Sequence, residues 1–240
     1  MNKIMPIIRK EMKSYFNSPI AYIVVIFFLI FTSVWLFLIQ QFFNMDTASM
    51  RPYFQIMPIV FVILVPAMTM RSWAEEKKMG TEELLLTLPF RESHVVIGKF
   101  LAAFILLAIM VGLSIPVPLS ISVLGDFDIG PIIGEYLGVL LLGATGLSIG
   151  LFISSVSTNQ ITAFIFGVIA LLIVTLIGQI NLVMNLPEWL ANVINYISLD
   201  FHFDSFRKGL IDTRDMLFFI CVSFLFLYLN MKVLIFKKWS

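Results

Sequence analysis

The sequence predicts an all-α membrane protein with six transmembrane helices, an N-terminal interfacial amphipathic helix, a short cytoplasmic helix and short outer helices before the last span. Of its 240 residues, 60% are hydrophobic and 13% are charged, whereas soluble domains carry about 25% charged residues. Six apolar stretches reach the roughly 20 residues that a membrane-spanning helix needs. The basic residues gather in alternate connections, as they do in multi-pass membrane proteins.

Residues 1–19 predict a helix that lies in the membrane interface, because apolar and basic residues occupy opposite sides of the helical wheel. The apolar side holds Ile4, Met5, Ile8, Met12, Tyr15 and Phe16, and the basic side holds Lys3, Arg9, Lys10 and Lys13. The alternative is a basic flank that only orients the first span. We expect no cleaved signal peptide, since residues 20–39 form too long an apolar run and no small-x-small cleavage site follows it.

The six spans are expected at residues 20–39, 54–70, 100–124, 134–153, 161–184 and 216–236. The second span is short and contains Pro58 and Pro66, and we expect it to continue as a helix past Arg71 into water. Pro116 and Pro118 lie near the end of the third span, where they should bend the helix.

Most of the basic residues fall on one side of the membrane in this arrangement. That side holds Lys3, Arg9, Lys10, Lys13, Arg71, Lys77, Lys78, Arg91, Lys99, Lys232, Lys237 and Lys238, and the other side holds Arg51, Arg207, Lys208 and Arg214. Because positive charge favours the cytoplasmic side, we expect a protein of the cytoplasmic (inner) membrane with both termini in the cytoplasm.

The polar connection at residues 71–99 predicts a short cytoplasmic helix between the second and third spans. Gly80 breaks the helix that carries the charged residues 75–78. Thr81 can cap a new helix whose first turn holds two glutamates, where the helix dipole favours anions. Leucines at positions 84, 85, 86 and 88 give this helix an apolar face, and Pro89 stops it. A helix of this kind is suited to binding a soluble partner.

The outer loop at residues 185–215 contains two candidate helices. Residues 187–196 are apolar enough to lie in or dip into the membrane surface, and an ordinary exposed loop is the alternative. Phe201, Phe203 and Phe206 have the spacing of a second short helix. The sequence Asp212-Thr-Arg-Asp215 predicts a cap for the last span.

Several classes of function are disfavoured by what the sequence lacks. No ionisable residue falls in the middle of a predicted span, and Glu135 and Lys232 lie at span edges, which argues against a self-powered ion-coupled transporter. The single cysteine, Cys221, gives neither a disulfide nor a thiolate metal site. Gly98-Lys99 lacks the frame of a phosphate-binding loop, and no metal-binding spacing occurs. We expect no cofactor, metal or catalytic residue on this chain, and no nucleic-acid partner, because its basic residues form no stripe.

The sequence Gly146-Leu-Ser-Ile-Gly150 matches the G-x-S-x-G motif, and rhomboid intramembrane proteases place a serine nucleophile in a comparable span. A serine nucleophile needs a general base, usually a histidine on a neighbouring helix. His94 and His202 both fall in predicted loops rather than on such a helix. A rhomboid-like protease that acts through Ser148 is therefore the weaker alternative.

Helix packing accounts better for the glycines of the fourth span, which are Gly134, Gly138, Gly143, Gly146 and Gly150. They form two G-x-x-x-G patterns and leave much of the helix bare, so that another helix can approach closely. The sequence leaves open whether that neighbour belongs to the same chain or to a second subunit.

Taken in order, these features resemble those of ABC-2 type permeases, the membrane subunits of ABC transporters. Two strings sharpen the resemblance: Trp73-Ala-Glu-Glu-Lys77 with Gly80-Thr-Glu-Glu-Leu84, and His202-Phe-Asp-Ser-Phe-Arg-Lys-Gly-Leu-Ile-Asp212. They are similar to the subgroup that includes the gliding-motility-associated and the nitrous-oxide-respiration permeases. The resemblance covers nearly the whole chain as one transmembrane domain, residues 1–240.

The resemblance implies a pump in which two permease chains, identical or related, pair with two cytosolic ATPase subunits that bind ATP and Mg. The cytoplasmic helix would be the coupling helix that docks on the ATPase, and the interfacial helix would be the connecting helix that rides on it. Gliding-type members can also work with a larger membrane subunit that has an extracytoplasmic domain. The residues implied in ATPase coupling are Glu75, Glu76, Lys77, Lys78, Gly80, Thr81, Glu82, Glu83, Leu84, Leu85 and Leu88.

The apolar spans suit a lipid-like or lipoprotein substrate, so we expect an exporter or a force-transmitting complex in contact with membrane lipid. The alternative is a membrane scaffold that transports nothing.

Overall fold

The computed structural model describes residues 4–42, 50–80, 91–122, 129–183 and 187–239. Every regular element in these ranges is a helix. Six helices are long and apolar enough to cross a membrane, and they are Pro19–Ile39, Met57–Lys78, Glu92–Ser122, Gly130–Val156, Gln160–Gln179 and Thr213–Phe236. The prediction of an all-α membrane protein with six spans is confirmed.

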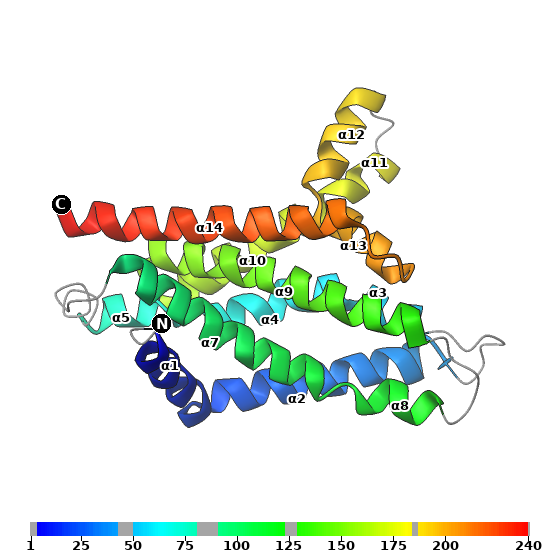
Figure 1. The fold of residues 1–240 in the computed structure, drawn as a ribbon, viewed down its shortest axis with the longest axis horizontal. Coiled ribbons are helices and arrows are strands. Elements are labelled where there is room, and N and C mark those ends of the chain that lie inside the picture. The colour runs from blue at the N-terminus through cyan, green and yellow to red at the C-terminus, as the bar shows by residue number, and fades with distance from the viewer. Residues whose placement is uncertain (1–3, 43–49, 81–90, 123–128, 184–186, 240) are drawn as a thin grey trace.

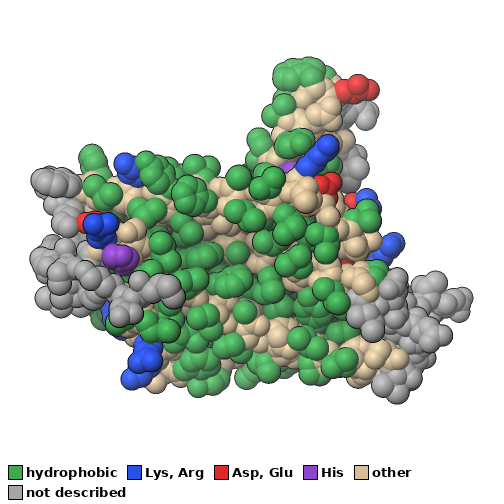
Figure 2. Space-filling model, in the orientation of Figure 1, with side chains coloured by type: hydrophobic (Ala, Val, Ile, Leu, Met, Phe, Trp, Pro, Cys, Tyr) green, Lys and Arg blue, Asp and Glu red, His purple; other side chains and the backbone are tan. Residues whose placement is uncertain are grey.

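The six spans run along the longest axis of the molecule, and both chain termini lie at one end of the bundle (Figure 1). Hydrophobic side chains cover the middle of the surface in view, and charged side chains gather towards the two ends (Figure 2). A broad apolar belt of this kind suits contact with the hydrocarbon of a bilayer, where every backbone polar group must be satisfied within the protein. The chain is therefore a multi-pass membrane protein.

Helix α9 is central to the bundle, because it packs against most of the other long helices. Its bounds and those of its neighbours are α9 Ile129–Val156, α4 Met57–Thr69, α7 Glu92–Gly112, α10 Gln160–Leu176 and α14 Thr213–Trp239. The Thr145 hydroxyl of α9 donates a 3.0 Å hydrogen bond to the Phe219 carbonyl of α14. Buried polar contacts of this kind join membrane helices to one another.

The glycines of α9 lie where neighbouring segments of the same chain come closest. A Cβ added at Gly138 would lie 2.5 Å from Phe206 Cβ, and one added at Gly143 would lie 2.5 Å from Leu107 Cδ1. At Gly150 it would meet the Thr69 side chain. Gly134 faces the backbone of Gly209, and Gly146 faces Val65 at ordinary contact distances. The partner that the sequence left open is therefore found within the chain for all five glycines.

The N-terminal helix α1 (Met5–Asn17) meets α2 (Pro19–Val34) at a corner, where the Ser18 hydroxyl accepts a hydrogen bond from the Ile20 N–H. α1 packs against α7 with Ile7 and Glu11 buried, while Arg9, Lys10 and Lys13 stay exposed. The basic side thus faces outward as the wheel predicted. The buried side differs from the prediction, since Met5 and Phe16 are exposed and an acid takes a buried position.

The second and third spans are interrupted near their ends. α4 ends at Thr69, and the chain makes a turn at residues 70–73 before α5 (Ala74–Lys78). The helix expected to continue past Arg71 therefore continues in broken form. α7 ends at Gly112 and α8 (Pro116–Ser122) follows, which is the bend expected from the two prolines. α7 begins at Glu92, well before the expected start of the third span, and so includes Lys99.

The opposite end of the bundle is covered by short helices. The first span ends in a π-helical segment, and the elements at this end are η1 Trp35–Ile39, α3 Arg51–Gln55, η3 Ile177–Gln179, α11 Ile180–Val183, α12 Glu188–Ile197 and α13 Leu199–Arg207. α12 points sideways, away from the bundle and across its long axis (Figure 1). α13 confirms the helix predicted from the three phenylalanines.

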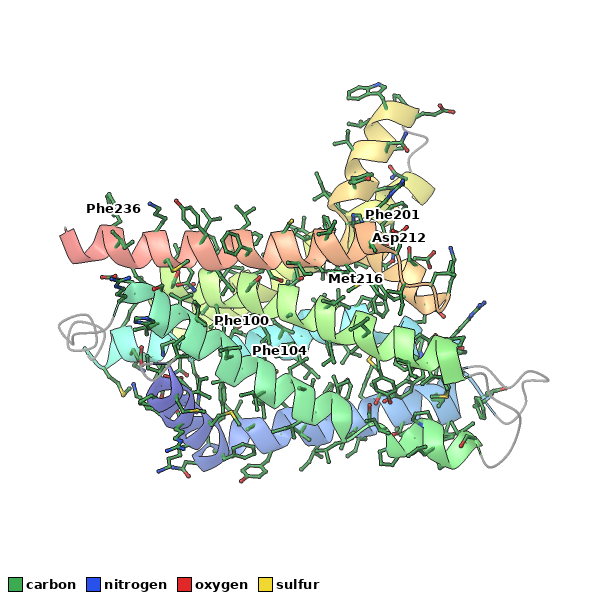
Figure 3. The ribbon with its side chains drawn as sticks, viewed as in Figure 1. Phe100, Phe104, Phe201, Asp212, Met216 and Phe236 are labelled. Atoms are coloured by element: carbon green, nitrogen blue, oxygen red, sulfur yellow. The ribbon has the colours of Figure 1, made fainter. Side chains whose placement is uncertain are left out.

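The predicted cap of the last span is also confirmed. α14 begins at Thr213, and the Asp212 carboxylate accepts a 2.8 Å hydrogen bond from the Arg214 N–H. Figure 3 shows Asp212 and Met216 at one end of α14 and Phe236 near the other, so the capped helix runs from beside α13 to the end of the bundle that holds both termini.

We predict that Gly138→Ala destabilises the protein, because its methyl group would overlap Cβ and Cγ of Phe206, and overpacking of this kind costs about 1–3 kcal/mol. The matched control is Gly112→Ala, which meets nothing within 4 Å and should leave stability unchanged or raise it by about 0.5–1 kcal/mol. The measurement is the thermal unfolding midpoint in detergent. Equal midpoints for the two variants would contradict the packing assigned to α9.

Candidate functional site

The end of the bundle that holds both termini contains a buried ion cluster centred on Lys99. The Lys99 ammonium nitrogen lies 3.0 Å from Glu11 Oε1 and 3.0 Å from Glu76 Oε1. It also donates a 2.7 Å hydrogen bond to the Ser72 carbonyl. Only 1% of the Lys99 surface is exposed. An ammonium has three N–H donors, so these three acceptors satisfy it completely.

Two further groups complete the cluster. The Lys99 ammonium lies 4.8 Å from the centre of the Trp73 ring, which is a favourable cation–π position. Lys10 contributes a second ammonium, 3.1 Å from Glu76 Oε1. Two lysines are thereby paired with two glutamates, so neither buried glutamate is left without a counter-charge. We call Lys10, Glu11, Ser72, Glu76 and Lys99 the Lys99 cluster.

The Lys99 cluster joins three helices that are far apart in the sequence. Glu11 comes from α1, Glu76 from α5 and Lys99 from the second turn of α7. Tyr15 on α1 strengthens the same junction, since its hydroxyl donates to the Met68 carbonyl at 3.3 Å. Burial raises the pKa of the Tyr15 phenol, so it remains a neutral donor. The interfacial helix and the end of the second span are therefore linked directly.

The same turn is held on its other side by the end of α9. The Ser154 hydroxyl oxygen accepts hydrogen bonds from the N–H groups of Trp73 at 3.2 Å and Ala74 at 3.3 Å. These are first-turn donors of α5 that have no partner within their own helix. The Lys77 ammonium donates to the Ser155 and Ser157 carbonyls at the end of α9. A lysine placed there also complements the helix dipole.

The sequence-predicted coupling residues divide into an inward and an outward group. Glu76 and Lys77 point into the chain, towards the Lys99 cluster and α9. Glu75 is partly exposed, and Lys78 is exposed. Gly80 has a φ of +69°, a left-handed conformation that glycine adopts without strain. The remaining coupling residues lie outside the described part of the chain, and they are Thr81, Glu82, Glu83, Leu84, Leu85 and Leu88.

Sequence reasoning missed the most deeply engaged members of this site. Lys99 was counted as one of many cytoplasmic charges, and Glu11 was left out of the helical wheel. One signal was available for Glu11, because it is an acid four residues from both Ile7 and Tyr15 and therefore shares their side of the helix. No local pattern identifies Ser154, whose partners lie 80 and 81 residues away.

The serine of the G-x-S-x-G motif, Ser148, bonds within its own helix. Ser148 is buried, and its hydroxyl donates a 2.7 Å hydrogen bond to the Thr145 carbonyl of its own helix. His202 lies on α13, where its Nδ1 is 2.7 Å from Asp215 Oδ1 and its Nε2 is 3.1 Å from the Tyr196 carbonyl oxygen. Among the described residues, Ser148 and a histidine form no nucleophile–base pair.

A comparison with protein families supports the resemblance found in the sequence. The family described as ABC-2 family transporter protein matches residues 5–235. The match includes the whole Lys99 cluster, the first five spans and the sixth span up to residue 235. No curated protein matches the chain.

We predict that Lys99→Met destabilises the folded chain by about 3–5 kcal/mol, because it leaves Glu11 and Glu76 buried without their shared counter-charge. Lys13→Met, on the exposed side of α1, is the matched control and should change stability by less than about 0.5 kcal/mol. Unfolding in a denaturant titration compares the two. A Lys99 variant as stable as the Lys13 variant would show that the buried ion cluster does not hold these helices.

Proposed function

The chain belongs to the ABC-2 family of transporter proteins, and on this premise we propose that it is the permease subunit of a pump driven by a separate cytosolic ATPase. The observation that carries the proposal is the anchoring of α5. This helix is bonded to α1 and α7 through the Lys99 cluster and to α9 through Ser154 and Lys77. The segment after Gly80 is thus attached to a base from which displacement can spread into the bundle.

The predicted coupling helix supplies the docking element. Its two glutamates and its leucines follow Gly80 directly. An ATPase that binds this helix and moves it would displace α5. The contacts of α5 would then transmit this displacement to α1, α7 and α9 together. A displacement can be carried between helices by contiguous contacts such as hydrogen bonds and ion pairs. The Lys99 cluster and the Ser154 hydrogen bonds are contacts of this type.

In the proposed orientation, this end of the bundle lies on the cytoplasmic side of the inner membrane. Both termini and α5 lie at the same end (Figure 1). The basic residues of α1 and α5 belong to that end, as the bias of positive charge towards the cytoplasm requires. ATP and Mg would then bind only to the partner subunit, and this chain would supply no catalytic group.

A second permease chain would complete the membrane part of the pump. We place it against α4 and α10, which pack on each other so closely that a Cβ added at Gly167 would lie 3.0 Å from Pro66 Cβ. Ile59 and Ile63, one turn apart on α4, remain exposed, and so do Ile165 and Ile169 on α10. These exposed side chains would form the contact with the second chain. The partner chain would be identical or related.

The substrate class follows from the apolar character of the spans. The charged residues of the described spans lie near helix ends, with Lys99 and Glu135 buried in the protein. No ionisable side chain is available halfway along a described span to balance a charged solute. We therefore propose export of a lipid-like substrate or transmission of force across the membrane. The resemblance to gliding-motility permeases suggests a third component of the pump. This component would be a larger membrane subunit with an extracytoplasmic domain.

We predict that this chain, solubilised in mild detergent, retains an ATPase in near-equal amount, and that Leu85→Glu releases it by placing a charge on the apolar face of the docking helix. The matched control is Leu210→Glu, since Leu210 is exposed and follows α13, which lies at the opposite end of the bundle (Figure 1). Quantitative mass spectrometry of the eluate and its ATP hydrolysis rate give the readout.

Two results would overturn this assignment. Purification of the native chain without any ATPase would favour the membrane scaffold instead. Retention of the ATPase by the Leu85 variant at the level of the Leu210 variant would show that docking occurs elsewhere.

A further inference from the structure

A cavity of about 920 Å³ lies beside the Lys99 cluster, between α1, the start of α2, the end of α4, α5 and α7. Part of its lining is apolar and belongs to the ends of two membrane spans, with Ile20 and Ala21 from α2 and Ala67 and Met68 from α4. Arg71 and Glu75 line it beyond the end of α4. The lining of the cavity therefore changes from apolar, at the ends of the two spans, to polar beyond the end of α4.

Arg71 and Glu75 are the charged groups of this cavity whose bonding is incomplete. They lie one helical turn apart, yet Arg71 Nε and Glu75 Oε2 are 3.9 Å from each other, which is too far for a hydrogen bond. The side chains remain 37% and 35% exposed. Arg71 donates one hydrogen bond, of 2.7 Å, to the Ser18 hydroxyl.

Both members of this pair keep hydrogen-bonding capacity beyond these contacts. Within the described residues the buried Arg71 Nε–H has no acceptor, and the Glu75 carboxylate accepts no hydrogen bond. A guanidinium and a carboxylate thus stand side by side with bonding capacity to spare.

The other charged side chains that line the cavity are already paired, with the Lys10 side chain 60% exposed. Lys10, Glu11, Glu76 and Lys99 pair with one another in the Lys99 cluster, and their formal charges cancel. What remains is one positive and one negative group at the polar part of the cavity. This arrangement matches a ligand that carries one negative and one positive charge a few ångströms apart and is joined to an apolar body.

We propose that this cavity binds a phospholipid of the phosphatidylethanolamine class. Arg71 receives the phosphate, since a guanidinium matches phosphate oxygens in geometry and charge. The Glu75 carboxylate accepts from the primary ammonium, and the acyl chains lie along the apolar lining towards the bilayer. The cavity volume falls in the usual range for ligand sites, about 300–1,000 Å³, which accommodates a headgroup and glycerol.

The chemistry of Glu75 makes the site selective among headgroups. A primary ammonium has three N–H donors for a carboxylate, whereas the quaternary ammonium of phosphatidylcholine has none. Phosphatidylglycerol lacks a cation and would offer the Glu75 carboxylate no ammonium. A lipid bound here would connect the corner between α1 and α2 to α5. The proposal rests on the chain being a membrane protein and is independent of the ATPase.

Native mass spectrometry of the purified, delipidated chain without any ATPase tests the proposal. The probes are phosphatidylethanolamine, phosphatidylcholine and phosphatidylglycerol with identical acyl chains, and soluble glycerophosphoethanolamine. We expect the ethanolamine lipid to bind about tenfold more tightly than the other two lipids, as the loss of a charge-assisted hydrogen bond predicts. The soluble headgroup, which lacks the apolar body, should bind far more weakly than the lipid.

Two variants and a control assign the roles of the two residues. Arg71→Gln should weaken the ethanolamine and glycerol lipids alike, by about tenfold or more. Glu75→Gln should leave phosphate binding in place and remove the preference for ethanolamine over choline and glycerol. Arg9→Gln, at an exposed position of α1 outside the cavity, should bind as the native chain does. Thermal midpoints of all three confirm folding.

Three results would overturn the proposal. Equal binding of the three lipids would mean that the chain holds only a general lipid annulus. A preference for ethanolamine that survives Glu75→Gln would place the selectivity elsewhere. Binding of the soluble headgroup as tight as that of the lipid would show a site for a free phosphoamine rather than for a membrane lipid. Because no ATPase is present, none of these results depends on whether ATPase docking is correct.

Discussion

The arrangement of this end of the bundle depends on the partners that surround the buried ammonium group of Lys99. A buried charge is tolerated only where other polar groups replace its hydration. Glu11, Glu76 and the Ser72 carbonyl supply these groups, and they come from two separate segments of the chain, α1 and the turn that leads into α5. α1, α7 and the start of α5 are therefore fixed to one another, because moving any of them away would leave a buried charge without its partner.

A second constraint extends this rigid junction into the membrane. α9 lacks side chains where α7, α4 and α13 approach it, so these elements contact the helix backbone closely. At its end, Ser154 bonds the N–H groups that begin α5. The segment after Gly80 thus emerges from a base that is joined to the central helix and to the interfacial helix. The cavity beside that base lies where a lipid headgroup would contact the same junction.

Local sequence features predicted the local structure well and the tertiary contacts poorly. The six spans follow from the length of apolar runs, the bend before α8 from Pro116, and the start of α14 from the capping residue Asp212, each of which acts within a few residues. The pairing of Lys99 with Glu11 joins residues 88 positions apart, and no periodicity encodes it. The early start of α7 was missed for the same reason, since Lys99 resembles a loop charge until its partners are known. The docking helix itself stays a prediction, because residues 81–90 lie outside the described part of the chain.

The most direct test of the account is whether α1 and α5 move as one body when the pump works. Spin labels at Lys13→Cys and Lys78→Cys, both exposed positions, would be introduced after the native Cys221 is replaced by serine, and their separation measured by pulsed electron resonance in nanodiscs that contain the ATPase. The account predicts one narrow distance distribution that ATP leaves unchanged, while the distance from the Lys78 label to one at Leu210→Cys shifts. A distance between α1 and α5 that is broad, or that changes with ATP, would contradict the claim that the Lys99 cluster joins them.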